Sequence, residues 1–204
     1  MKTLLGRLRN RSAAPDSGLA TTLQPPIEPP PAVAWAQRMR EVGARPFDSK
    51  EAARRLVNLW RVDPGFSALD DAALQRLAAQ LEAAVVDEGA DLVRQDETST
   101  HLLVLLEGRV AIEQVSPRGK RTPLAEARGG DLLGEPGSLD AGPRTAMCRT
   151  LVPSIVAAIE LTALQRLVVD DAPLAAALYA AIARRLSLRL RQTGARLGAL
   201  LSPI

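Results

Sequence analysis

The chain has 204 residues and a net charge of +3, with 47% apolar and 24% charged residues. This composition permits a packed core and excludes wholesale disorder. Two Trp, two Phe and one Tyr are the only aromatic residues, so the core must consist mainly of aliphatic side chains. Nucleic-acid modules that stack bases on aromatic rings are therefore disfavoured.

The single cysteine, Cys148, and the single histidine, His101, exclude a disulfide framework and a Cys/His zinc site. One cysteine fits a reducing compartment, and we expect a cytoplasmic protein. The sequence holds no run of about 18 apolar residues that would predict a membrane span. Its charged start also has no apolar segment of the kind found in secretory signals.

The N-terminal third carries the basic excess, with ten Lys and Arg against five Asp and Glu in residues 1–60. Residues 12–33 are rich in Ser, Thr and Pro, a composition typical of a flexible or polyproline-II linker. We therefore expect residues 1–33 to form a disordered basic tail. A membrane-surface or partner helix at residues 1–11 is the alternative, and a tail without membrane contact is preferred.

Residues 34–61 are predicted to form a helical extension. Asp48 and Glu51 have the spacing of a capping box, and an apolar stripe at helical spacing runs from there to Trp60. A second helix start is expected at Asp70. These helices are predicted to be packing elements and not ligand sites.

From residue 84 the apolar pattern changes to that of strands. Short apolar runs, bounded by Gly, Asp or a Ser-Pro-Arg-Gly turn, predict a sandwich or a barrel. These runs are Val85–Val86, Leu92–Val93, His101–Leu106 and Gly108–Ile112. More strands are expected after residue 150, followed by helices at 161–168 and 172–200. The order is therefore short helices, a compact β unit and further helices, without internal repeats.

The segment Gly130–Cys148 has the residues of an anion site between two strands. Its glycines permit close backbone approach, and Pro136 suits the first turn of a short helix, whose N–H groups attract anions. Arg144 can fork around phosphate oxygens. Glu135 would repel a bare phosphate. Its presence favours a ligand that also offers a hydroxyl donor, such as a ribose 2′-OH.

Two stretches of this segment, Leu133-Gly-Glu-Pro-Gly-Ser-Leu139 and Pro143-Arg-Thr-Ala146, carry a specific resemblance. They resemble the phosphate-binding cassette of the cyclic nucleotide-binding domain family, which includes bacterial catabolite activator-type regulators and protein kinase A regulatory subunits. The family pattern is approximately Phe-Gly-Glu-x-(Ala/Gly)-x-Leu, a short spacer and Pro-Arg-(Thr/Ser/Ala)-Ala. Flanking turns and helices extend the resemblance to residues 62–204.

The resemblance implies an α+β fold. Its centre is an antiparallel β-barrel roll, of the double-stranded β-helix or jelly-roll type, flanked by N-terminal helices and a long C-terminal helix. It also implies a non-enzymatic sensor of cAMP or cGMP that needs no cofactor besides this ligand. The sequence itself has no Ser/His/Asp set, paired acid–base carboxylates or metal cluster in a common motif.

In the ligand site that the resemblance implies, Glu135 accepts from the ribose 2′-OH and Arg144 pairs with the cyclic phosphate. The backbone N–H groups of Gly137 and Thr145 donate to phosphate oxygens, and Gly134 permits close contact with the sugar. The remaining candidates are three cassette residues and two residues of the last helix that could cap the base: Leu133, Leu139, Ala146, Leu188 and Arg189.

Departures from the family pattern leave alternatives open. Leu133 replaces a larger residue, and Ser138 stands where many members have a Leu that couples the cassette to the moving helix. A structural or assembly module with a vestigial pocket is one alternative. A cyclic dinucleotide receptor is another, for which Arg149 and Arg189 are the further bases nearby. Thr145 does not distinguish cAMP from cGMP.

The chain ends just past the long helix, so we expect a stand-alone bacterial sensor without a DNA-binding domain. Its output is then an unidentified effector protein. Leucines recur along the last helix among its arginines, a pattern typical of a packing stripe or of a homodimer interface.

Overall fold

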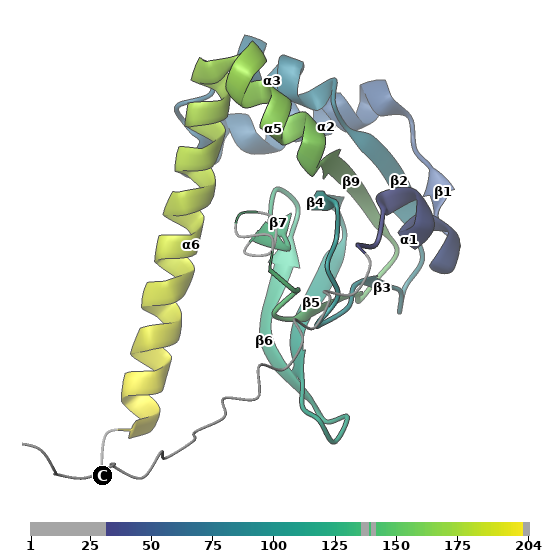
Figure 1. Cartoon of the computed structure of the whole chain (residues 1–204), viewed down its shortest axis with the longest axis vertical. Coiled ribbons are helices and arrows are strands. Elements are labelled where there is room, and N and C mark those ends of the chain that lie inside the picture. The colour runs from purple at the N-terminus through teal and green to yellow at the C-terminus, as the bar shows by residue number, and fades with distance from the viewer. Residues whose placement is uncertain (1–31, 136–138, 140–141, 202–204) are drawn as a thin grey trace, which may run out of the picture.

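The computed structural model describes residues 32–135, 139 and 142–201, so residues 1–31 of the predicted tail lie outside it. Helices cover one end of two antiparallel sheets, and one long helix runs past their side (Figure 1). In chain order the described elements are α1 (Trp35–Glu41), β1 (Arg45–Pro46), α2 (Ser49–Arg61), the 3-10 turn η1 (Pro64–Phe66), α3 (Asp71–Ala78), β2 (Glu82–Val86), β3 (Asp91–Val93), β4 (His101–Glu107), β5 (Arg109–Val115), β6 (Arg121–Arg128), β7 (Leu132–Leu133), β8 (Met147–Thr150), β9 (Ser154–Glu160), α5 (Leu161–Asp170) and α6 (Ala172–Leu201).

The strands form one sheet in the order β1-β2-β9-β4-β7 and a second in the order β3-β8-β5-β6. All the strand pairs are antiparallel. The mixture of helices and antiparallel sheets agrees with the predicted α+β class. The two sheets are not joined by strand pairing among the described residues, so closure into a barrel is not confirmed.

Strand β4 is buried on both faces and separates two apolar cores. Leu103 and Leu105 face the core between the sheets, whereas Leu102, Val104 and Leu106 face the core under the helices. Successive side chains of a strand point to opposite faces, so this continuous apolar run serves both cores.

The N-terminal helices contribute to both cores. Trp35 of α1 is fully buried in the core between the sheets, and Trp60 of α2 is fully buried in the core under the helices. The predicted caps are confirmed: Asp48 Oδ1 accepts from the Glu51 N–H at 2.8 Å, and Asp70 caps α3 in the same way.

The predicted helical extension over residues 34–61 consists of two helices with a short strand between them. The first helix ends at Glu41, Gly43 has a φ of +64°, and the chain then forms β1, which pairs with β2. Pro46 lies in this short edge strand, where a missing N–H is tolerated. Strand β6 was also not predicted, because most of its residues are exposed and show no alternation.

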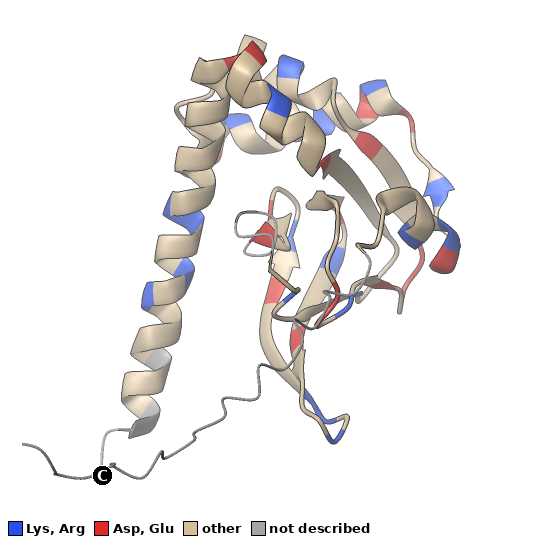
Figure 2. Cartoon of the chain, in the orientation of Figure 1, with Lys and Arg blue, Asp and Glu red and all other residues tan. Residues whose placement is uncertain are grey.

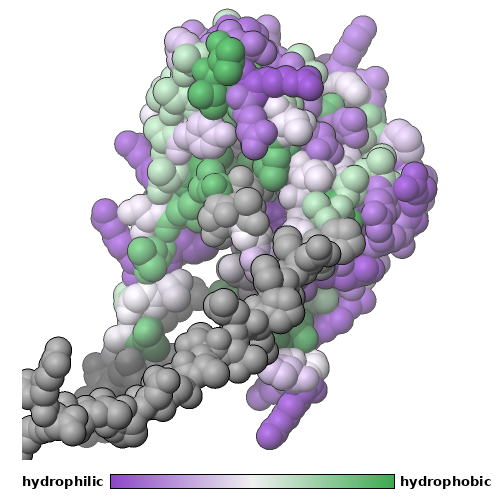
Figure 3. All heavy atoms as spheres, viewed as in Figure 1, coloured by the Kyte–Doolittle hydropathy of each residue, from purple (hydrophilic) through white to green (hydrophobic). Residues whose placement is uncertain are grey.

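Helix α6 is anchored at its N-terminal half. Leu174, Leu178 and Ile182 are buried under the helices. Arg185 forms ion pairs with Asp63 and Asp131, with Nη1 3.0 Å from Asp131 Oδ1. Beyond this anchor the helix runs past the sheets, with basic residues in its middle (Figure 2). Hydrophobic residues, green in Figure 3, also lie on this side of the molecule.

Gly108 offers a test of the β4–β5 turn. Its φ is +105°, and a Cβ at this position would lie 2.9 Å from Ser154 Cα. We expect Gly108→Ala to lower the free energy of unfolding by about 3–5 kcal/mol, because backbone strain and overpacking each contribute. Gly43 has a φ of +64° and no neighbour within 4 Å of its Cβ position. Gly43→Ala should therefore cost only about 1–2 kcal/mol. Equal losses for both variants in urea unfolding would contradict this account.

Candidate functional site

The candidate cassette begins where β7 ends. Leu133 pairs with Leu103 of β4 and is buried between the sheets, which fixes the start of the segment. Gly134 follows with a φ of +83°, and a Cβ at this position would run into the guanidinium of Arg144. Glycine is therefore required for Arg144 to lie against the backbone here.

The guanidinium of Arg144 is inserted into the protein, and only 3% of this residue is exposed. Its Nη1 donates to the carbonyl of Gly134, and its Nη2 donates to the Ser99 hydroxyl and to the His101 carbonyl. Burial lowers the pKa of Arg144 below its ordinary value. An arginine nevertheless keeps its proton in proteins, so the site contains a buried cation.

The loop before β4 holds the backbone of Arg144. The Arg144 N–H donates to the Glu97 carbonyl at 2.7 Å, and the Arg144 carbonyl accepts from the Asp96 N–H at 2.8 Å. Asp96 has a φ of +67°, in the left-handed region that aspartate tolerates better than most residues. This loop therefore fixes both the main chain and, through Ser99, the side chain of Arg144.

Glu135 is the second buried charge of the cassette, with 1% of the residue exposed. Arg189 Nη1 of α6 lies 3.3 Å from its carboxylate. The long helix therefore contacts the residue that is predicted to accept from a ribose hydroxyl.

Glu135, Arg144 and Arg189 line one cavity of about 430 Å³, a size typical of small-molecule sites. The other walls are mainly apolar and come from the sheet β3-β8-β5-β6 and from the cassette, and α6 adds two further polar residues. These further lining residues are Val93, Ile112, Pro123, Leu124, Ala125, Gly134, Thr145, Ala146, Cys148, Gln192 and Thr193.

The structure brings most of the predicted site residues together at this cavity: Gly134, Glu135, Arg144, Thr145, Ala146 and Arg189. Leu133 lies in the core behind it, and Gly137 lies outside the described residues. Leu139 and Leu188 are 43% and 51% exposed and are not among the residues that line the cavity. One residue turns a helix by about 100°, so Leu188 and Arg189 point in different directions.

Two lining residues of α6, Gln192 and Thr193, were not predicted. They lie three and four residues after Arg189, on the same face of α6, so helical spacing could have identified them. Pro123–Ala125 of β6 were not predicted either, because this strand is mostly exposed and shows no alternation.

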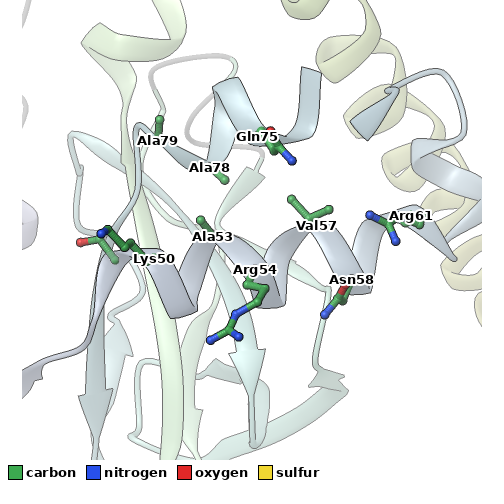
Figure 4. A pocket seen from close by; sticks show the side chains of 10 residues that line it. Lys50, Ala53, Arg54, Val57, Asn58, Arg61, Gln75, Ala78 and Ala79 are labelled. Carbon is green, nitrogen blue, oxygen red and sulfur yellow. The ribbon is translucent and has the colours of Figure 1, made fainter. Parts of the chain in front are cut away.

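A second hollow lies between α2 and α3 (Figure 4), and no cassette residue is among those that line it. Its volume is about 600 Å³, and its apolar part consists of small side chains such as Ala53 and Val57. Arg54 and Arg61 at this groove already pair with Glu51 and Asp71. The groove therefore lacks the converging buried charges of the cassette.

Two titratable groups near Arg144 are held neutral. Cys148 lines the cavity, and burial raises the pKa of its thiol to about 12. His101 is 2% exposed, and burial, with smaller contributions from Arg144 and Arg38, lowers its pKa to about 3. The neutral imidazole adds no further positive charge beside the two arginines.

The neutral His101 predicts a pH dependence of stability. The unfolded chain binds a proton at His101 below the ordinary pKa of 6.5, whereas the folded chain does so only near pH 3. Stability should therefore fall as the pH drops from 6.5 towards 3, by up to about 1.4 kcal/mol per pH unit from this group. Urea unfolding of the protein and of His101→Phe between pH 7 and 4 measures the difference, with about equal slopes contradicting the prediction.

Among the described residues, no group of three or more His, Cys, Asp or Glu side chains could hold a metal ion. None of the described helices has the length and apolar character needed to cross a membrane.

Comparisons with known proteins point to one family. Residues 84–171 match the model of the cyclic nucleotide-binding domain. A solved cyclic nucleotide-binding domain from Methylobacillus flagellatus has a similar fold, with a TM-score of 0.72, 17% identity and coverage of 81% of this chain and 93% of that one. The N-terminal domain of a transcriptional regulator from Streptomyces coelicolor is 33% identical, with a TM-score of 0.55 and coverage of 63% and 92%.

A probable transcriptional regulator, flp, from Lacticaseibacillus casei is 29% identical over 133 residues, which are 65% of this chain. The match spans 60% of that relative's length. The family match begins in β2 and ends just after α5, so it contains the cassette and both sheets apart from β1. Residues 84–171 therefore form a cyclic nucleotide-binding domain, and the chain belongs to the family of proteins that carry it.

Proposed function

We propose that this chain is a non-enzymatic sensor that binds a 3′,5′-cyclic nucleotide, cAMP or cGMP, in the cavity beside Arg144. The main support is the convergence of one buried cation and one buried anion, Arg144 and Glu135, on a single cavity. A cyclic nucleotide offers a matching pair of groups, because its phosphate is anionic and its ribose 2′-OH is a donor. The family consists of regulatory ligand-binding domains, which agrees with a sensor and not with an enzyme.

In this proposal the phosphate pairs with Arg144, and the 2′-OH donates to Glu135. The base lies between the apolar wall of the sheet β3-β8-β5-β6 and the polar residues of α6, where Arg189, Gln192 and Thr193 line the cavity. Ligand contacts on α6 would change how the helix lies against the cassette. A preference of only a few kcal/mol between two helix positions is enough to shift their populations. An effector protein that contacts α6 would detect this change.

One observation favours a second candidate, a structural module with a vestigial pocket. Both charges already have partners within the protein, Arg144 in the carbonyls of Gly134 and His101 and Glu135 in Arg189. A cyclic dinucleotide receptor has less support, because its second phosphate needs another base. Arg149 Nη1 lies 3.7 Å from Asp91 Oδ1, and Arg149 is not among the residues that line the cavity. Of the lining residues, Arg189 is then the one further base for a second phosphate.

Calorimetric titration with cAMP, cGMP and cyclic di-GMP tests these candidates. We expect one ligand to bind, Arg144→Ala to weaken binding by about 2–5 kcal/mol and Glu135→Ala to weaken it by about 1–3 kcal/mol. Arg149→Ala is the matched control, since it removes a nearby arginine outside the cavity. Equal affinities for the protein and Arg144→Ala would contradict the site, and absence of binding by folded protein would favour the vestigial module.

We also propose that α6 mediates a homodimer. Leu190 and Leu197 are 73% and 55% exposed on the part of the helix beyond the anchor, and their spacing of seven residues places them on one face. Exposed leucines on one helix pack well against a second copy.

Replacement of Leu190 and Leu197 by Glu should weaken such a dimer by about tenfold or more, because charges in an apolar interface remain unpaired. Sedimentation equilibrium measures the dimer constant. Val169→Glu is the control, since this valine is 85% exposed but lies on α5 and not on the proposed interface of α6. A constant that is unchanged in the double variant would contradict this interface.

A further inference from the structure

The N-terminal arm, residues 33–41, is hydrogen-bonded to the segment that holds the Arg144 side chain. Val33 forms a parallel bridge with Ser99. The Val33 N–H donates to the Thr98 carbonyl at 3.0 Å, and the Val33 carbonyl accepts from the Thr100 N–H at 3.4 Å. The segment 98–100 therefore has the arm on one side and, through Ser99, the guanidinium of Arg144 on the other.

A cluster of ion pairs around the buried Arg38 fixes the rest of the arm to the same loop. Arg38 of α1 is 1% exposed and pairs with Glu41 at 2.8 Å and with Glu97. Arg94 also lies 3.2 Å from Glu41, which completes a cluster of two arginines and two glutamates. Glu97 is the residue whose carbonyl accepts from the Arg144 N–H, so a single loop joins Arg38 to Arg144.

The aromatic side chain of the arm, Trp35, packs beside His101, another residue that contacts Arg144. Trp35 is fully buried, and its ring centroid lies 5.4 Å from that of His101. The carbonyl of His101 is one of the acceptors of Arg144. The arm therefore packs against both residues, Ser99 and His101, that accept hydrogen bonds from Arg144 Nη2.

The hydrogen bonds of Arg144 conflict with phosphate binding. Both N–H groups of its Nη2 are used, by Ser99 and by the His101 carbonyl. A phosphate that binds an arginine in the bidentate mode across Nη1 and Nη2 accepts one N–H from each of these atoms. This binding mode requires Arg144 to give up its hydrogen bond to Ser99 or to the His101 carbonyl. The arm packs against these same two residues.

We propose that docking of the N-terminal arm and phosphate binding at Arg144 oppose each other, so that ligand loosens residues 33–41. This inference rests on the proposed binding of a cyclic nucleotide. It makes the arm a second responsive element beside α6, although residues 33–41 are not among those that line the cavity. Arg38 acts as a positioning residue, because it holds the loop that keeps Arg144 on its internal acceptors.

Thermodynamic linkage makes the effect reciprocal. If ligand loosens the arm, a change that loosens the arm must raise the affinity for ligand by the same factor. A partner that captured the released arm would likewise tighten ligand binding. If the docked arm instead held Arg144 in the conformation that binds phosphate, loosening the arm would lower the affinity for ligand. An increase or a decrease in affinity therefore distinguishes the two cases.

Hydrogen exchange of the full-length protein with and without saturating cAMP, or cGMP if only that nucleotide binds, tests the inference without any substitution. Peptides that cover residues 33–41 and 96–101 should exchange about fivefold faster or more in the liganded protein. Unchanged or slower exchange in a protein that calorimetry shows to be saturated would overturn the inference and leave the proposed function intact. Absence of calorimetric binding would overturn both.

Substitution of Arg38 gives an independent test in the same protein. Arg38→Met should bind the nucleotide about fivefold more tightly or more, and Arg38→Lys should restore an affinity closer to the original. Arg45→Met is the matched control, because Arg45 pairs with Asp87 near the same terminus at 2.9 Å but has no link to the loop of Arg144. Unchanged or weaker binding by Arg38→Met would contradict the proposal.

Discussion

The buried guanidinium of Arg144 organises the site. A charge removed from water is costly unless it is paired or hydrogen-bonded, and the Nη atoms of Arg144 donate to acceptors from two separate segments. Gly134 contributes a carbonyl at the start of the cassette, and Ser99 and His101 contribute acceptors where β4 begins. Because these segments share one cation, the cassette, the sheet under it and the N-terminal arm are tied together through a single side chain.

The second charge, Glu135, connects this centre to α6. The helix is fixed at its N-terminal half by apolar packing and by the ion pairs of Arg185 with Asp63 and Asp131. Further along, Arg189 pairs with Glu135 across the cavity. The cavity thus lies between a firmly packed sheet and a helix that is anchored mainly at one end. This arrangement gives a ligand two ways to influence the protein, through α6 and through the arm.

Local chemistry explains which features could be predicted from the sequence. The cassette was predictable because Gly134, Glu135 and Arg144 lie close together in the chain, and the caps at Asp48 and Asp70 depend on neighbours three residues away. The strand after Glu41 was not predicted, because β1 has only two residues and both are exposed. The pairing of Arg38 with Glu97 joins residues 59 apart and leaves no sequence pattern. The relation of the arm to Arg144 therefore emerged only from the structure.

The central claim is that Glu135 and Arg144 recognise the ribose and phosphate of one ligand, and paired titrations with cAMP and 2′-deoxy-cAMP test it most directly. The protein should bind the deoxy nucleotide about tenfold or more weakly, since a hydrogen bond to a buried carboxylate is lost. Glu135→Ala should bind both nucleotides about equally, because its acceptor is absent. Equal affinities in the unaltered protein, or a difference that persists in Glu135→Ala, would contradict the account.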